Sequence, residues 1–69
     1  MTRNELIGFM EKSETGDVLK MHISVDAFDA ARRHIVNGGA FVNLIMNTNR
    51  VAGVISGDRD ATSICQLAD

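Results

Sequence analysis

The segment Asp17–Val25, with the sequence DVLKMHISV, alternates between apolar and polar residues from Leu19 onward. A period of two is typical of a β-strand that has one face buried and the other in water. We therefore expect this segment to be a strand. Its polar face then carries Lys20, His22 and Ser24.

The residues that follow this strand favour a helix. Asp26 is a suitable N-cap residue, because its carboxylate can accept hydrogen bonds from the unpaired amides of a first turn. The apolar residues that recur at helical spacing after it are Ala27, Phe28, Ala31, Ile35 and Val36. Asn37–Gly39 (NGG) is typical of a helix end. The sequence thus predicts a helix that begins at Asp26 and ends before Asn37.

A second helix is expected near the start of the chain. Thr2 and Glu5 have the spacing of a capping box, in which each side chain bonds to a backbone amide at the helix start. The apolar residues after it, at spacings of three and four, are Leu6, Ile7, Phe9 and Met10. This spacing predicts one apolar helix face, and Gly16 follows as a stop.

The segment Ala40–Met46 (AFVNLIM) predicts a second strand, which is apolar on both faces. Phe41 and Ile45 flank Asn43 on one of those faces. Such a strand is either covered on both sides or exposes one side to a partner. With a helix between them, the two strands are expected to form a parallel β-α-β unit.

The last third of the chain predicts two further elements. Val51–Ser56 fits a short helix or a strand, and we favour a helix that is capped within Asn47–Asn49 and ends at Gly57. Thr62–Leu67 predicts a final strand. The expected fold is a single compact α+β (small α/β) domain over 1–69, with a three- to four-stranded sheet covered on one face by two helices. The expected order is α-β-α-β-(short α or β)-β.

A chain of 69 residues is a small scaffold. It buries about 60% of the surface that its unfolded form exposes, so domains of this size commonly need a disulfide, a metal or self-association. Cys65 is the single cysteine, and with His22 and His34 it provides too few ligands for a structural zinc site. We therefore expect no metal and no cofactor, and the 45% hydrophobic content favours a homodimer.

The net charge of −2 disfavours nucleic acid as a partner, because affinity for phosphates comes from an excess of Lys and Arg. No apolar run approaches the roughly 20 residues that span a bilayer, so no membrane partner is expected. The first residues lack the apolar core of a signal peptide. With one unpaired cysteine, the sequence indicates a cytoplasmic protein.

No spacing of His, Cys, Ser and acidic residues indicates a catalytic site, so we expect a protein that is not an enzyme. Arg32 and Arg33 are the one adjacent basic pair and are candidates for anion binding. Asp26 and Asp29 precede them at helical spacing, so salt bridges along a helix surface are the simpler explanation.

The run Lys20–Val25, followed by an Asp-capped helix, resembles the opening of a ribbon-helix-helix DNA-binding dimer. This resemblance implies that two strands pair across a dimer and that Lys20, His22 and Ser24 contact the major groove. It also implies a second helix over Phe41–Ile45, where the sequence favours a strand.

The function expected from the sequence is that of a small protein-binding or regulatory module, acting through a partly apolar sheet face as a homodimer. The expected partner-binding residues are Phe41, Asn43, Ile45, Lys20, His22 and Ser24. Large apolar residues at the centre of a patch with polar neighbours are typical of protein interfaces. The alternatives are a ribbon-helix-helix-like DNA-binding regulator and a phage-type small inhibitor of a larger enzyme complex.

Overall fold

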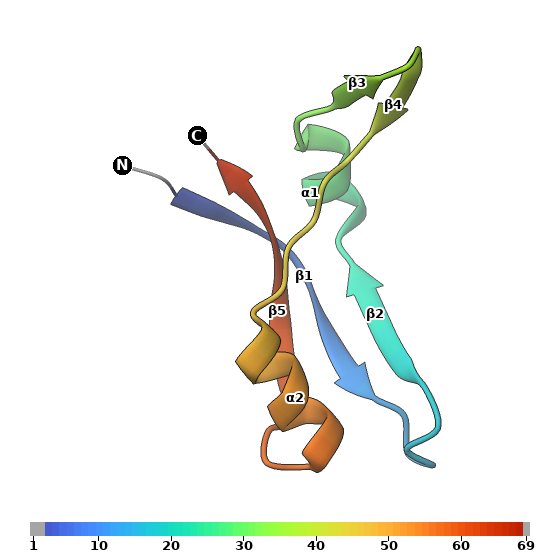
Figure 1. Ribbon diagram of the computed structural model, residues 1–69, viewed down its shortest axis with the longest axis vertical. Coiled ribbons are helices and arrows are strands. Elements are labelled where there is room, and N and C mark those ends of the chain that lie inside the picture. The colour runs from blue at the N-terminus through green and yellow to red at the C-terminus, as the bar shows by residue number, and fades with distance from the viewer. Residues whose placement is uncertain (1–2, 69) are drawn as a thin grey trace.

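The computed structural model describes residues 3–68, and its elements follow the order β-β-α-β-β-α-β (Figure 1). The strands are β1 (Arg3–Lys12), β2 (Leu19–Ile23), β3 (His34–Val36), β4 (Gly39–Phe41) and β5 (Ala61–Ala68). The helices are α1 (Val25–Ala30) and α2 (Thr48–Ser56). The chain is therefore a small mixed α/β fold in which strands predominate.

Two small antiparallel sheets replace the single sheet that the sequence predicts. The larger has the order β2-β1-β5, and the smaller is the β3–β4 hairpin. The predicted α+β arrangement, with a three- to four-stranded sheet under two helices and a parallel β-α-β unit, is wrong. All strand pairs within the described residues are antiparallel, and the first element is a strand.

The central strand, β1, occupies the segment for which the sequence predicts a helix. Leu6 pairs with Cys65 of β5, but Gly8 pairs with the adjacent Ile64, so Ile7 is one extra residue in β1. Such a β-bulge shifts the alternation of the strand by one position. A central strand that is apolar on both faces and bulged in the middle therefore shows the spacing of a helix. Of the predicted capping box, Glu5 lies in β1 and Thr2 lies outside the described residues.

Close approach of two strands requires glycine at position 8. A Cβ atom on Gly8 would lie 2.0 Å from the carbonyl oxygen of His22 in β2. Ordinary contacts of this kind are longer than 3.4 Å, so any other residue would force β2 away from β1. The position of β2 beside β1 thus depends on the absence of a side chain here.

Helix α1 is shorter than predicted and has a different cap. The Ser24 hydroxyl, not Asp26, is the N-cap group, and it accepts a hydrogen bond of 3.2 Å from the Ala27 amide. The chain leaves helical geometry at Ala31 (ψ 148°). The buried side chain of Gln66 then accepts from the Arg32 amide at 2.8 Å and donates to the Arg32 carbonyl at 2.9 Å. The helix therefore ends where β5 binds its backbone.

The Asn-Gly-Gly run turns a hairpin instead of ending a helix. Asn37 (φ 49°) and Gly38 (φ 83°) are both left-handed, as the favoured two-residue turn between antiparallel strands requires. Ile35 and Val36 consequently belong to β3. The strand predicted over Ala40–Met46 is present only in β4, after which Ile45 makes an isolated antiparallel bridge to Cys65 of β5.

Helix α2 and strand β5 confirm the predictions for the last third of the chain. The Asn47 side chain caps α2 by accepting from the Arg50 amide at 3.1 Å, and Gly57 (φ 91°) ends it. The helix packs against the sheet through a small core, formed by Met10, Val54 and Ile64 with Ile23 and Val51 beside them. Neither helix within residues 3–68 has the length and apolar character needed to cross a membrane.

The fold implied by the resemblance to ribbon-helix-helix proteins is not observed. Phe41–Ile45 contains the end of a strand and an isolated bridge, where that fold needs a helix. Strand β2 pairs with β1 of the same chain, whereas the ribbon-helix-helix fold pairs its strand with the same strand of a second copy.

Candidate functional site

The β2-β1-β5 sheet has a covered face and an open face. Directly opposed residues of antiparallel strands project on the same side, so the pairs Met10–Thr62 and Gly8–Ile64 define the face under α2. Phe9, which lies between them and pairs with Ser63, projects on the other side. Leu6, which pairs with Cys65 beyond the bulge, projects there too. Leu6 is 67% exposed and Phe9 is 45% exposed. A sheet of only three strands thus leaves large apolar side chains in contact with water.

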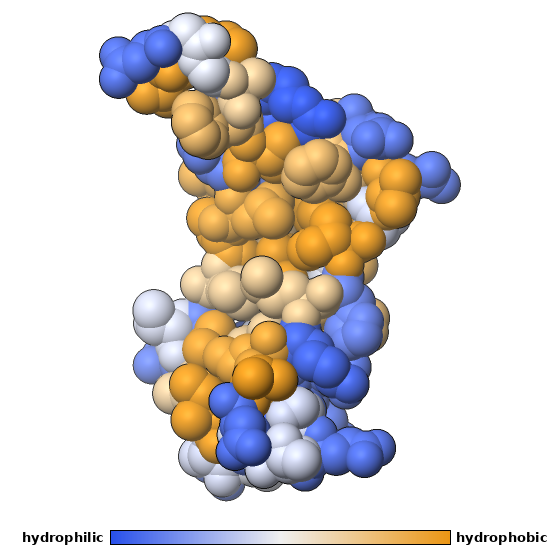
Figure 2. Space-filling model, turned by 90° about the vertical axis from the view of Figure 1, so that its right-hand side faces the viewer, coloured by the Kyte–Doolittle hydropathy of each residue, from blue (hydrophilic) through white to orange (hydrophobic). Residues whose placement is uncertain are grey.

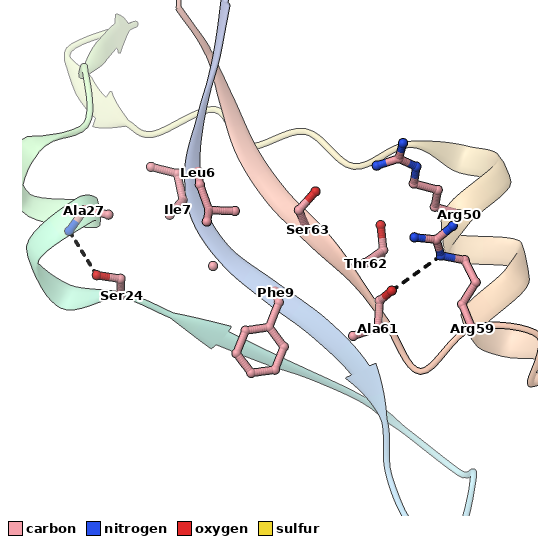
Figure 3. A pocket seen from close by; sticks show the side chains of 11 residues that line it. Leu6, Ile7, Phe9, Ser24, Ala27, Arg50, Arg59, Ala61, Thr62 and Ser63 are labelled. Atoms are coloured by element: carbon pink, nitrogen blue, oxygen red, sulfur yellow. Dashed lines mark hydrogen bonds between the residues drawn. The ribbon is translucent and has the colours of Figure 1, made fainter.

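This open face is hollowed by a depression of about 570 Å³. Figure 3 shows Leu6, Phe9 and Ser63 projecting from β1 and β5, with the start of α1 on one side and two arginines on the other. A second depression of about 300 Å³ shares Arg50 and Ser63 with the first and extends to Ile45. The two adjoin, so the hollow follows β5 toward its outer edge.

Arg50 and Arg59 are the two positively charged residues of this hollow. Arg50 lies in the first turn of α2, and Arg59 lies in the turn before β5, where its Nε donates to the Ala61 carbonyl at 3.5 Å. The aliphatic part of Arg59 lies against Gly53, where a Cβ atom would come within 2.9 Å of Arg59 Cδ. The one salt bridge among the described residues joins His22 and Glu11. Neither guanidinium group therefore has a carboxylate partner in this part of the chain.

Phe9 is held in place by its neighbour on β2. Its ring stacks on the His22 imidazole, with centroids 4.5 Å apart and planes inclined by 18°. His22 Nε2 in turn lies 2.8 Å from Glu11 Oε2. An aromatic side chain that is fixed before binding loses little conformational entropy when a partner covers it, which suits an anchor of an interface.

The structure separates the six predicted partner-binding residues. Lys20 and His22 lie on the open face, because they pair with Glu11 and Phe9 of β1. Ser24 borders the depression, and its hydroxyl caps α1.

Of the other three predicted residues, Ile45 lines the second depression beyond β5, and Phe41 and Asn43 lie elsewhere. Phe41 is in the β3–β4 hairpin and is 54% exposed. Asn43 lines a third hollow beside Gln66 and Arg32, and Ile45 pairs with β5 on the side opposite β2. The six residues therefore do not form one surface, since the predicted parallel strands that would have aligned them are absent.

Arg32 and Arg33, the predicted anion-binding pair, both bond to backbone carbonyls. The Arg32 guanidinium donates to the carbonyl of Leu67. Arg33 Nη1 donates to the Phe28 carbonyl at 2.9 Å, and its guanidinium carbon lies 4.9 Å from the centre of the Phe28 ring. These contacts hold the segment after α1 in place.

The two histidines and the cysteine lie in three different strands, His22 in β2, His34 in β3 and Cys65 in β5. In the described part of the chain, no cluster of three or more His, Cys, Asp or Glu residues could hold a metal ion. Cys65 is half-buried.

Four residues of the open face are not predicted from the sequence: Leu6, Phe9, Arg50 and Arg59. The spacing of the first two indicates a helix, because the bulge at Ile7 hides the alternation of β1. The two arginines are separated in sequence, and only the turn from α2 into β5 brings them to one hollow.

The chain shows no match to any protein-family model, to any curated protein or to any solved structure with which it was compared.

Proposed function

We propose that this chain is a non-enzymatic protein-binding module and that it binds through the open face of the β2-β1-β5 sheet. One observation carries the proposal. Exposed apolar side chains, Leu6 and Phe9, lie in the same hollow as two guanidinium groups that have no carboxylate partner among the described residues. Apolar anchors beside arginine are typical of the energetic centres of protein interfaces.

The chemistry of the hollow defines the partner. Covering the exposed parts contributes about 1.5 kcal/mol for Leu6 and about 1 kcal/mol for Phe9. Arg50 and Arg59 favour carboxylates, which guanidinium groups bind with charge-assisted hydrogen bonds. The partner that fits best is therefore a protein segment in which a bulky apolar side chain stands next to Asp or Glu.

Selection from a random displayed peptide library tests this specificity directly. We expect the selected peptides to combine a bulky apolar residue with an acidic one. Phe9→Ala should weaken their binding at least about 30-fold, as expected for an anchor residue. Phe41→Ala is the matched control, because it removes a ring of similar exposure from the separate hairpin, and it should leave binding unchanged.

A second pair of variants tests whether binding depends on the positive charge of the hollow. Arg59→Gln should weaken the binding of the selected acidic peptides, and Lys12→Gln, which removes the same charge from the end of β1, should not. Selection of peptides without acidic residues, or equal losses for Phe9→Ala and Phe41→Ala, would refute the proposed surface.

A regulatory subunit and a phage-type inhibitor of a larger enzyme complex would both use such a surface, and these finer roles remain predictions. A cytoplasmic site of action also remains a prediction, consistent with the unpaired Cys65. The DNA-binding alternative predicts retardation of a duplex by the intact chain, with an affinity that falls steeply as salt is added.

A further inference from the structure

The β3–β4 hairpin, residues His34–Phe41 and here called the arm, projects from the rest of the chain (Figure 1). It pairs with itself and has no substantial contact with another described helix or strand. Ile35 is 70% exposed, and Val36 and Phe41 are each 54% exposed. A two-stranded hairpin is marginally stable at best in water when nothing packs against it. The arm therefore lacks the packing partner that its apolar side chains need.

The surface area shows how much packing is missing. The chain exposes 5165 Å², whereas a folded monomer of 7.5 kDa exposes about 4,250 Å². Its radius of gyration is 13.5 Å, against about 11 Å for a compact domain of this length. The excess of about 900 Å² is close to the roughly 800 Å² that each partner buries in a standard interface.

The charge distribution favours a second copy of the same chain as the partner. From His34 to Asn49 the sequence contains no Asp, Glu, Lys or Arg, although charged residues make up 23% of the chain. Figure 2 shows hydrophobic residues gathered over the middle and upper part of one side of the molecule. When two copies meet through the same surface, a charge near the two-fold axis faces its own copy, and a charge elsewhere needs an opposite charge on that same surface. An arm without Asp, Glu, Lys or Arg avoids that repulsion.

We propose that two copies of this chain associate through their arms, with Val36 and Phe41 at the centre of the interface. His34 pairs with Phe41 and Val36 with Gly39, so Val36 and Phe41 share one face of the hairpin. The ring of Phe41 lies over Gly39, where an added Cβ would be 3.2 Å from the ring. This face therefore holds an apolar patch of Val36, Gly39 and Phe41, with the His34 imidazole at its edge. Self-association of this kind is separate from peptide binding at the open sheet face.

The test is the molecular mass in solution, measured by light scattering and sedimentation over a wide range of protein concentrations. The wild-type chain should be a dimer at high concentration. Val36→Asp places one charge from each copy in the interface, so the dissociation constant should rise by about 1,000-fold, taking about 30-fold for each hot-spot residue. Val18→Asp is the matched control, because Val18 is 58% exposed in the β1–β2 turn region and outside the arm.

Phe41→Ala should dissociate the dimer and keep peptide binding. Phe9→Ala should keep the dimer and weaken peptide binding. Far-UV circular dichroism shows whether each variant is folded. If Val36→Asp fails to fold, hydrogen exchange of the wild-type arm amides tests whether the arm is buried in a dimer. These amides should then exchange more slowly as protein concentration rises. A wild-type monomer at all concentrations, exchange that is independent of concentration, or equal dissociation by Val18→Asp and Val36→Asp would overturn the proposal.

Discussion

Replacement of Gly8 by alanine tests how the central sheet is built. The new Cβ atom would lie 2.0 Å from the His22 carbonyl oxygen, and that oxygen belongs to the backbone of β2, which cannot rotate away. To restore an ordinary contact of 3.4 Å, β2 must retreat by about 1.4 Å. Hydrogen bonds between β1 and β2 do not survive such a displacement, because N–H···O bonds span about 2.7–3.2 Å between donor and acceptor.

The cost follows from the contacts that depend on Gly8. Two or three backbone hydrogen bonds between β1 and β2 are lost, each with a net value of about 1 kcal/mol, and the stacking of His22 on Phe9 is disturbed. About 0.5 kcal/mol of this loss is offset, because alanine has less conformational freedom than glycine in the unfolded chain. We expect the free energy of unfolding to fall by about 3 kcal/mol. For a domain of this size, the melting temperature then falls by about 20 °C.

Thermal unfolding followed by circular dichroism measures this change, and Gly53→Ala is the matched control. Its new Cβ atom would lie 2.9 Å from Cδ of Arg59, which is part of a flexible side chain that can move aside. Gly53 is also within helix α2, where alanine is favoured by about 1 kcal/mol. Gly53→Ala should therefore leave the melting temperature unchanged or raise it. A Gly8→Ala variant that melts within about 3 °C of wild type, or no more easily than Gly53→Ala, would refute this account of the sheet.

Three further substitutions test other contacts by urea unfolding and hydrogen exchange. Thr62→Val should stabilise the chain by about 1 kcal/mol, because the Thr62 hydroxyl is buried and has no hydrogen-bond partner among the described residues; a loss of stability would show that the hydroxyl is satisfied. Gln66→Ala should destabilise the chain by about 2 kcal/mol, since it removes both bonds to the Arg32 backbone; a change below about 0.5 kcal/mol would contradict this. Gly38→Ala should cost about 1 kcal/mol at its left-handed turn position and speed exchange in the arm, and unchanged exchange would count against the proposed turn.

The part of the fold that the sequence predicts correctly rests on local patterns. The alternation after Leu19 is present as β2, and α2 begins after an Asn47 cap and ends at Gly57. In these segments the residues that define the pattern lie close together in the chain. The conformation of these two segments therefore does not depend on residues far away in the sequence.

The errors occur where contacts between distant segments decide the conformation. The bulge at Ile7 exists because β5 pairs with β1, and it gives a strand the spacing of a helix. Helix α1 stops at Ala30 because Gln66, far along the chain, binds the backbone of Arg32. Asn37 and Gly38 can end a helix or turn a hairpin, and only the pairing of β3 with β4 distinguishes the two.

The same division applies to the candidate binding surfaces. The sequence by itself determines that the chain has one cysteine, a small net charge and a segment from His34 to Asn49 without Asp, Glu, Lys or Arg. From these properties we expect a small domain in which part of the apolar surface binds a partner. The properties themselves do not depend on which residues are neighbours in space.

Only the tertiary structure decides where that surface lies. It places Leu6 and Phe9 beside Arg50 and Arg59, and it separates Phe41 from His22, which the predicted sheet would have joined. The physical reason is that a face of an antiparallel sheet is assembled from strands distant in sequence, and its members depend on strand order and register. A pattern within one strand fixes which residues alternate, and the neighbouring strands fix which side meets the solvent.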